Sequence, residues 1–158
     1  MRIVVLGASG QIGRELSKDL RRRGVDVVEA SRASGVDAYT GEGLATALDG
    51  ADVVVDCLNI TTQSAPKAVD FFGTVATNVA QQALSSSVGH VVCLSIINAA
   101  DPAVNAKFGY YRGKAEQEKV YRDTLDPDRL AIVRSSQWYE LAHQLMSSLR
   151  LGPVAAVP

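Results

Sequence analysis

Short apolar runs alternate along the chain with longer stretches in which apolar residues recur every three or four positions. Runs of this length are typical of buried strands, and the longer stretches have the period of a helix with one buried face. The expected strands span residues 3–6, 25–31, 36–39, 51–58, 90–95 and 130–134, and the expected helices span 11–23, 43–48, 70–84, 108–122 and 136–151. Because near-continuous apolar strands separated by helices favour a parallel sheet covered on both faces, we predict an α/β protein. Its expected fold is a three-layer, doubly wound Rossmann fold with about six strands.

The first expected strand and helix are joined by a glycine-rich turn, Gly7-Ala8-Ser9-Gly10-Gln11-Ile12-Gly13. In such a turn the first glycine permits the bend, the second lets a ligand approach the backbone, and the third lets helix and strand pack closely. The amides at the start of the helix have no partner within it, so they can bind an anion. In this strand–turn–helix context the motif predicts dinucleotide binding. The alternative is a structural glycine turn in another kind of α/β protein.

The end of the second expected strand reads Glu29-Ala30-Ser31-Arg32 and bears on the choice of cofactor. NAD sites usually place an acid there for the ribose diol, whereas NADP sites need a cation for the 2′-phosphate. Arg32 can bind phosphate oxygens in a fork and Ser31 can donate to them, so we predict NADP(H) in preference to NAD(H). Two alternatives stay open: Glu29 as the ribose acid, and Arg32 as a solvated loop residue.

A second group consists of Ser95, at the end of the fifth expected strand, and of Tyr110 and Lys114 on the helix that follows. Positions four apart share one face of a helix. A lysine ammonium beside a tyrosine favours the phenolate and lowers its pKa from about 10, which makes proton exchange possible. Ser95 would hydrogen-bond a substrate carbonyl. The alternative is a partly buried Tyr110 with Lys114 extended into water.

Composition narrows the functional classes further. The chain has 158 residues, 47% hydrophobic and 21% charged, which predicts one globular domain over residues 1–158. A net charge of −1 argues against nucleic acid or an anionic membrane as partner. Cys57 and Cys93 are expected to be buried reduced thiols rather than metal ligands. With no signal peptide or membrane-length apolar run, we expect a cytoplasmic protein.

Three segments together resemble the short-chain dehydrogenase/reductase superfamily, in its atypical or NmrA-like branch of NAD(P)-binding proteins. They are MRIVVLGASGQIGRELSKDLRRRG at the start, VVCLSIINA followed by YYRGKAEQEKV, and LAIVRSSQWYE. The resemblance implies that Ser95, Tyr110 and Lys114 are the catalytic serine, tyrosine and lysine, with Lys114 also holding the nicotinamide ribose. It places Cys57, Leu58 and Asn59 along the cofactor near its ribose, and it links an arginine at position 32 to NADP preference.

Two departures from the family pattern concern the C-terminal part. Arg134 is followed by Ser135-Ser136 where the family usually has proline. Members of the family are also usually longer, so the part that binds substrate is expected to be short or missing here. Gln137, Trp138 and Tyr139 are predicted to line the substrate side.

The predicted function is an oxidoreductase that passes hydride between NADP(H) and a small carbonyl, alcohol or conjugated alkene, with Tyr110 as general acid or base. The first alternative is a non-catalytic NADP(H) sensor or regulator of the NmrA-like type. A sugar-nucleotide epimerase or dehydratase is a third possibility. A small-molecule substrate and a homodimer are the expected partners.

Overall fold

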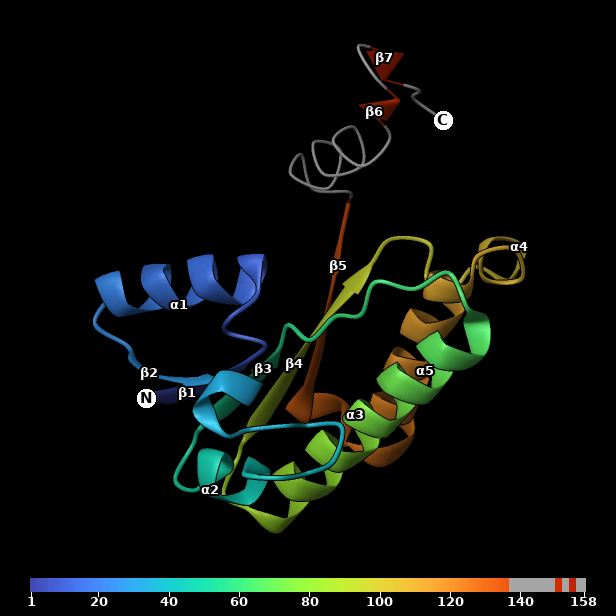
Figure 1. Ribbon diagram of the computed structural model, residues 1–158. Helices are drawn as coiled ribbons and strands as arrows, with labels where there is room; N and C mark the ends of the chain where they lie inside the picture. The colour runs from blue at the N-terminus through green and yellow to red at the C-terminus, as the bar shows by residue number, and fades with distance from the viewer. Residues whose placement is uncertain (137–149, 152–153, 156–158) are drawn as a thin grey trace.

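The computed structural model describes residues 1–136, 150–151 and 154–155, and its central feature is a parallel sheet of five strands (Figure 1). The strands stand in the order β2-β1-β3-β4-β5. They are β1 (Arg2–Leu6), β2 (Asp26–Ala30), β3 (Val53–Asp56), β4 (His90–Ile96) and β5 (Leu130–Ser135). Two short strands, β6 (Arg150–Leu151) and β7 (Val154–Ala155), form a separate antiparallel pair.

Helices lie on both sides of this sheet. They are α1 (Gln11–Arg22), α2 (Leu44–Leu48), α3 (Ala65–Ser85), α4 (Pro102–Asn105) and α5 (Gly109–Thr124), with short 3-10 turns η1 (Arg32–Ser34) and η2 (Pro127–Arg129). Figure 1 shows α1 on one side and α3 packed along α5 on the other. The predicted three-layer Rossmann architecture is therefore confirmed for the described residues.

The alternation of side chains along each strand produces two separate apolar layers. On one face Ile3 and Val5 of β1 pack with Leu16 and Leu20 of α1. On the other face, Val4, Leu6, Val54, Val91 and Cys93 join a larger core with α2, α3 and α5. Both layers are needed because every strand of a parallel sheet has two faces to bury.

The strand order places β1 between β2 and β3, so the chain changes direction across the sheet at this point. Leu6 is in register with Ala30 on one side and with Asp56 on the other. The ends of all three strands therefore meet at one edge, where doubly wound sheets bind their ligands.

The predicted strand at residues 36–39 is wrong. Residues 36–43 form a loop in which Gly41 and Gly43 have positive φ, as has Gly35 just before it. The Asp37 carboxylate accepts hydrogen bonds from the amides of Tyr39 and Thr40. Asp37 pairs only with Glu42, in an isolated bridge. Ala38 is nevertheless buried, because the loop packs against the core instead of joining the sheet.

The start of the helix predicted over 70–84 is also corrected. α3 begins at Ala65, five residues earlier, and Asp70 is not its cap. Pro66 lies in the first turn, where the missing amide hydrogen of proline costs no hydrogen bond. Of the helix predicted over residues 136–151, residues 137–149 lie outside the described residues. Ser136 is not helical, and Arg150 and Leu151 form β6, so the predicted helix is wrong at its two ends.

Candidate functional site

The glycine turn has the geometry that its spacing predicts. Gly7 has φ +76°, and its amide donates to Ala30 O at 2.9 Å, which ties the turn to the end of β2. A Cβ on Gly7 would lie 3.0 Å from Cys57 O, and a Cβ on Gly13 would lie 2.8 Å from Gly7 C. Gly7 thus serves the bend, and Gly13 serves the close packing of α1 on the turn.

Gly10 occupies the N-cap of α1, and no side chain of the residues that the structure describes caps this helix. The amides of the first turn, at Gln11 and Ile12, therefore have neither an intrahelical acceptor nor a capping side chain. Their partial positive charge and the helix dipole make this end suitable for a pyrophosphate.

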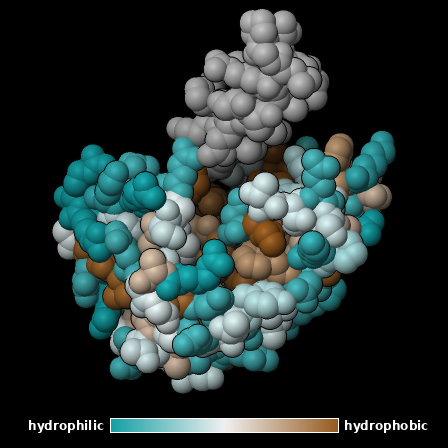
Figure 2. All heavy atoms as spheres, viewed as in Figure 1, coloured by the Kyte–Doolittle hydropathy of each residue, from teal (hydrophilic) through white to brown (hydrophobic). Residues whose placement is uncertain are grey.

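A pocket of about 520 Å³ opens at the ends of β1, β2 and β3. Eight of the predicted cofactor residues line it together: Gly7, Ser9, Gly10, Ser31, Arg32, Cys57, Leu58 and Asn59. Figure 2 shows a recess in the middle of this face with hydrophobic residues inside and hydrophilic residues around it. Ala8 is buried behind the turn, Gln11 is exposed and Ile12 half-buried on α1, and Gly13 packs below the turn, so these four are not part of the lining.

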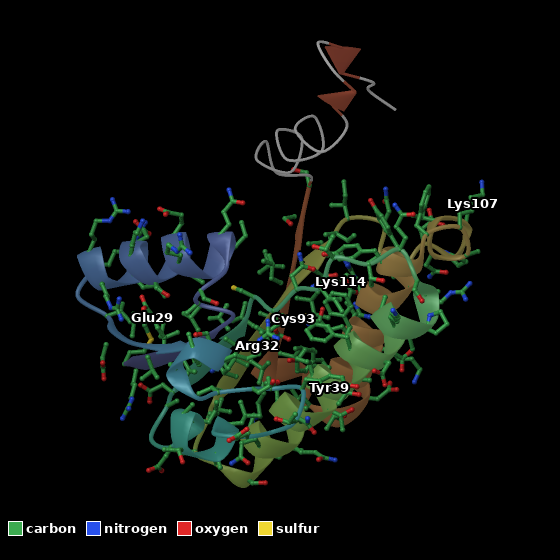
Figure 3. All side chains as sticks on the ribbon, viewed as in Figure 1. Glu29, Arg32, Tyr39, Cys93, Lys107 and Lys114 are labelled. Carbon is green, nitrogen blue, oxygen red and sulfur yellow. The ribbon has the colours of Figure 1, made fainter. Side chains whose placement is uncertain are left out.

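The two candidate residues for the ribose end of the cofactor, Glu29 and Arg32, have different surroundings at the end of β2. Glu29 forms an ion pair with Arg21 of α1, outside the pocket lining. Arg32 lines the pocket, and no carboxylate within residues 1–136 forms an ion pair with it. Figure 3 shows Glu29 near α1 and Arg32 beyond the strand end, nearer the centre of the molecule. The free cation, rather than the acid, is available to a ligand.

The pocket contains residues that the sequence prediction missed. Asp37, Tyr39, Lys67, Asp70 and Phe71 line it from the 36–43 loop and α3. The Tyr39 hydroxyl donates to Asp70 at 2.7 Å, and the Tyr39 and Phe71 rings stack with centroids 6.0 Å apart. These contacts join the loop to the helix across one end of the pocket. Gly35, Gly41 and Gly43 are a local sign of a loop around this segment, and the strand predicted over residues 36–39 takes no account of it.

The predicted catalytic serine does not reach this pocket. Ser95 shares its strand face with Val91 and Cys93, so its side chain points toward α5. Its hydroxyl is fully buried and has no hydrogen-bond partner among the described residues. It lies close enough to the Glu118 carboxylate to help lower the pKa of that group.

Tyr110 packs edge-on against Phe72, with ring centroids 5.7 Å apart, and against Tyr111. Burial, followed by the effect of Tyr111, raises the pKa of Tyr110 to about 12. This is opposite to the predicted lowering by Lys114. The phenol therefore holds its proton at neutral pH.

The ammonium group of Lys114 lies inside the protein. Its Nζ donates to Leu94 O at 3.0 Å and to Gln117 Oε1 at 2.9 Å, and it lies 4.3 Å from the centre of the Phe72 ring. Only 3% of the residue is exposed. Burial lowers the pKa of Lys114, and the negative charge of Asp56 opposes that effect. Tyr110 and Lys114 do share one face of α5, but neither they nor Ser95 line the pocket.

The profile of the NAD dependent epimerase/dehydratase family matches residues 3–144. The chain belongs to this family. An NAD(P)-binding Rossmann domain of the oxidoreductase type is consistent with the pocket described above. The match does not single out the predicted NmrA-like branch.

Solved structures of similar fold include two dTDP-4-dehydrorhamnose reductases. The one from Clostridium acetobutylicum has a TM-score of 0.73 and 21% identity, over 94% of this chain and 60% of its own. The one from Bacillus anthracis, in complex with NADP, has a TM-score of 0.70 and 17% identity, over 85% of this chain and 53% of its own.

A short-chain dehydrogenase/reductase superfamily protein from Agrobacterium tumefaciens with bound NAD has a TM-score of 0.69 and 18% identity, over 85% of this chain and 48% of its own. The chain thus spans about half to three fifths of the length of these proteins. No curated protein matches the sequence significantly.

Two classes of feature are not found in the part of the chain that the structure describes. None of its helices is long and apolar enough to cross a membrane. This part of the chain also contains no cluster of three or more His, Cys, Asp or Glu side chains that could bind a metal ion. The predicted substrate-side residues Gln137, Trp138 and Tyr139 lie outside the described residues.

Proposed function

We propose that this chain binds NADP(H) in the pocket at the ends of β1, β2 and β3 and passes hydride between it and a small carbonyl or alcohol. The observation that carries the proposal is the joint lining of one pocket by the glycine turn and by residues from two neighbouring strand ends. The uncapped start of α1 would hold the pyrophosphate, and Cys57, Leu58 and Asn59 would lie along the cofactor.

Preference for NADP(H) is supported by the charges at the end of β2. Arg32 can bind two phosphate oxygens at once, and the neighbouring Ser31 can add a hydroxyl donor. Glu29 forms an ion pair with Arg21 outside the pocket lining. Its carboxylate therefore would not repel a 2′-phosphate in the pocket and would not bind a ribose diol there. Lys67, also in the lining, adds a second positive charge, whereas the lining carboxylates of Asp37 and Asp70 come from the 36–43 loop and α3 rather than from the end of β2.

The proposed proton donor is Tyr110. A phenol whose pKa is about 12 stays protonated at neutral pH, which suits donation to the oxygen of a carbonyl that is being reduced. When bound, NADPH would supply a hydride for the reduction of the carbonyl. Lys114, on the same face of α5, is proposed to hold the nicotinamide ribose. Ser95 is not assigned a role, because its hydroxyl is buried against α5.

A second candidate is a non-catalytic NADP(H)-binding regulator of the NmrA-like type. The observation that favours it is the burial of Ser95 and Lys114, neither of which is among the residues that line the pocket. Tight NADP(H) binding without turnover on any substrate would support this candidate. A sugar-nucleotide substrate is the third possibility, and the family match favours including such substrates in any activity screen.

The experiment that tests the cofactor proposal is a fluorescence titration of the full chain with NADPH and with NADH. A charge-assisted contact contributes roughly 1.5–3 kcal/mol, so NADPH should bind about tenfold or more tightly than NADH, and Arg32→Ala should remove that difference. Arg23→Ala is the matched control, because Arg23 pairs with Asp19 at the far end of α1. Equal binding of the two nucleotides, or no binding of either, would overturn the proposal.

The cytoplasmic location and the homodimer remain predictions from the sequence. Light scattering of the purified chain tests the homodimer directly, since it yields the mass of the particle in solution. A single species of the mass of one chain at all concentrations would contradict it.

A further inference from the structure

A fully buried carboxylate stands at the end of β3, next to the proposed cofactor pocket. Asp56 accepts three hydrogen bonds: from Gln117 Nε2 at 2.7 Å, from the Tyr121 hydroxyl at 2.8 Å and from the Leu58 amide at 2.9 Å. Its exposed fraction is 0%. A buried charge of this kind is costly unless it is paired and hydrogen-bonded, so its partners are informative.

Gln117 connects this carboxylate to the ammonium of Lys114. The amide has one accepting end and one donating end, and the donating end must face Asp56, which only accepts. The accepting end, Oε1, therefore faces Lys114 Nζ at 2.9 Å, which only donates. Reversing the amide would break both hydrogen bonds, so the side chain has one permitted orientation.

Two of the three donors of Lys114 are hydrogen-bonded within the protein. Two hydrogen bonds go to Gln117 Oε1 and Leu94 O, and the Phe72 ring presents its face to the charge. In Figure 3, Lys114 lies at the centre of the molecule, whereas Lys107 points outward near α4. The ammonium is held by Gln117 of α5 and by the carbonyl of Leu94 on β4, and Gln117 in turn donates to the carboxylate at the end of β3.

We propose that Asp56 and Gln117 are positioning residues that hold the ammonium of Lys114 in place and join it to the wall of the cofactor pocket through the amide of Leu58. Asp56 makes the connection because one of its carboxylate oxygens accepts from the Leu58 amide and the other accepts from Gln117. Leu58 lines the pocket. The functional part of this proposal rests on the proposed role of Lys114 toward the cofactor.

Several ionisable groups face Lys114, and they differ in their charge at neutral pH. Burial lowers the pKa of Lys114. Among the groups that oppose this lowering, Asp56 has the largest effect, followed by Cys93, Cys57 and Glu118. Burial raises the pKa of both thiols, so they stay uncharged. Glu118 is bound by Arg134 and Arg122, which offset its charge. Asp56 is therefore the main counter-charge of Lys114.

The test follows the titration of Lys114 by NMR in the ligand-free full chain with isotope-labelled lysine. Lys114→Arg identifies the signal by its loss. Asp56→Asn keeps the shape but removes the charge, and Gln117→Leu removes the amide link. In both variants Lys114 should lose its proton at lower pH than in the wild type. Tyr121→Phe is the matched control, because it removes a hydrogen bond to Asp56 without touching Lys114, and its titration should stay near that of the wild type.

NADPH binding to the same proteins separates this proposal from the function on which it rests. If wild-type protein binds NADPH, Asp56→Asn and Gln117→Leu should each weaken binding about tenfold, the effect of losing one hydrogen bond to a charged group. A Lys114 titration unchanged in both variants, or shifted equally by Tyr121→Phe, would overturn the positioning role. Failure of the wild type to bind NADPH would overturn the proposed function, while the titration would still decide the positioning role. Should Asp56→Asn not fold, Gln117→Leu alone decides the outcome.

Discussion

Arg134 of β5 binds both carboxylate oxygens of the buried Glu118 of α5, from Nε at 2.9 Å and from Nη2 at 2.7 Å. Such forked pairs are more specific in geometry than single contacts. Arg122, one turn along α5, adds a third hydrogen bond at 2.8 Å. Because β5 is the edge strand of the five-stranded sheet, this contact fastens the edge of the sheet to the helix layer.

This pair makes stability depend on pH. Burial by itself would raise the pKa of Glu118, but the hydrogen bonds from Arg134 and Arg122, together with the nearby Ser95 hydroxyl, outweigh the effect of burial, and the pKa is lowered overall. The lowered folded-state pKa contributes stability above the unfolded pKa of about 4.3, and this contribution is lost as the pH falls through the folded value. Glu118→Gln should cost about 2 kcal/mol at pH 7 and reduce the loss of stability between pH 5 and pH 3. Urea unfolding at several pH values measures both effects.

The control for this prediction is Asp123→Asn, which breaks an exposed pair with Lys119 on the same helix and should have little effect. If wild type and Glu118→Gln lost stability equally on acidification, Glu118 would not be the source of the pH dependence.

Gly13→Ala should damage both the fold and the cofactor pocket. The added methyl would lie 2.8 Å from Gly7 C and 2.9 Å from Ala8 Cα, and the backbone of the turn would have to move. We expect a loss of about 1–3 kcal/mol in unfolding free energy together with weaker NADPH binding. Gly89→Ala is the control, since its methyl would meet Asp52 O at an ordinary 3.5 Å. Thermal unfolding and NADPH titration compare the two, and equal behaviour would refute the packing role of Gly13.

Cys57 reports on occupancy of the pocket. Burial, and then the charge of Asp56, raises the pKa of this thiol to about 12, which leaves about a thousandfold less thiolate at neutral pH than in an ordinary cysteine. Alkylation should therefore be slow, and NADPH should slow it further because Cys57 lines the pocket. Mass spectrometry of the Cys93→Ala variant follows Cys57 alone. Labelling at the same rate with and without saturating NADPH would place the nucleotide elsewhere.

Tyr110→Phe tests the proposed chemistry. The substitution keeps the ring against Phe72 but removes the group to which proton donation is assigned. The rate of NADPH oxidation by a panel of carbonyls and sugar nucleotides should therefore fall by about 10²-fold or more, the usual contribution of a general acid. NADPH affinity should change little, because Tyr110 is not part of the pocket lining. Undiminished turnover would remove Tyr110 from the mechanism, and absence of turnover in the wild type would favour the regulatory alternative.

Prediction of the secondary structure succeeded where local signals were strong. The apolar run before Gly7 and the apolar face of residues 11–23 correspond to β1 and α1 within a residue at each end. It failed at residues 36–39, where apolar residues are buried by packing of a loop rather than by pairing in the sheet. A burial pattern over four residues does not distinguish these two cases.

The sequence pattern does not single out Asp56, for a related reason. It directly follows Val53, Val54 and Val55, and nothing local indicates that its carboxylate stays inside the protein. Its partners Gln117 and Tyr121 are 61 and 65 residues away in the chain. Only the packing of α5 against the sheet brings them to it.

The sequence by itself determined the order of strands and helices and the glycine turn, because these depend on side-chain periodicity and on backbone freedom at neighbouring positions. It also placed Ser31 and Arg32 at the end of β2. Tertiary structure decided which charged groups are free and which are engaged: Glu29 is held by Arg21, and Lys114 is held by Gln117. The reason is physical, since charge and hydrogen bonding act through space between residues that sequence spacing does not relate.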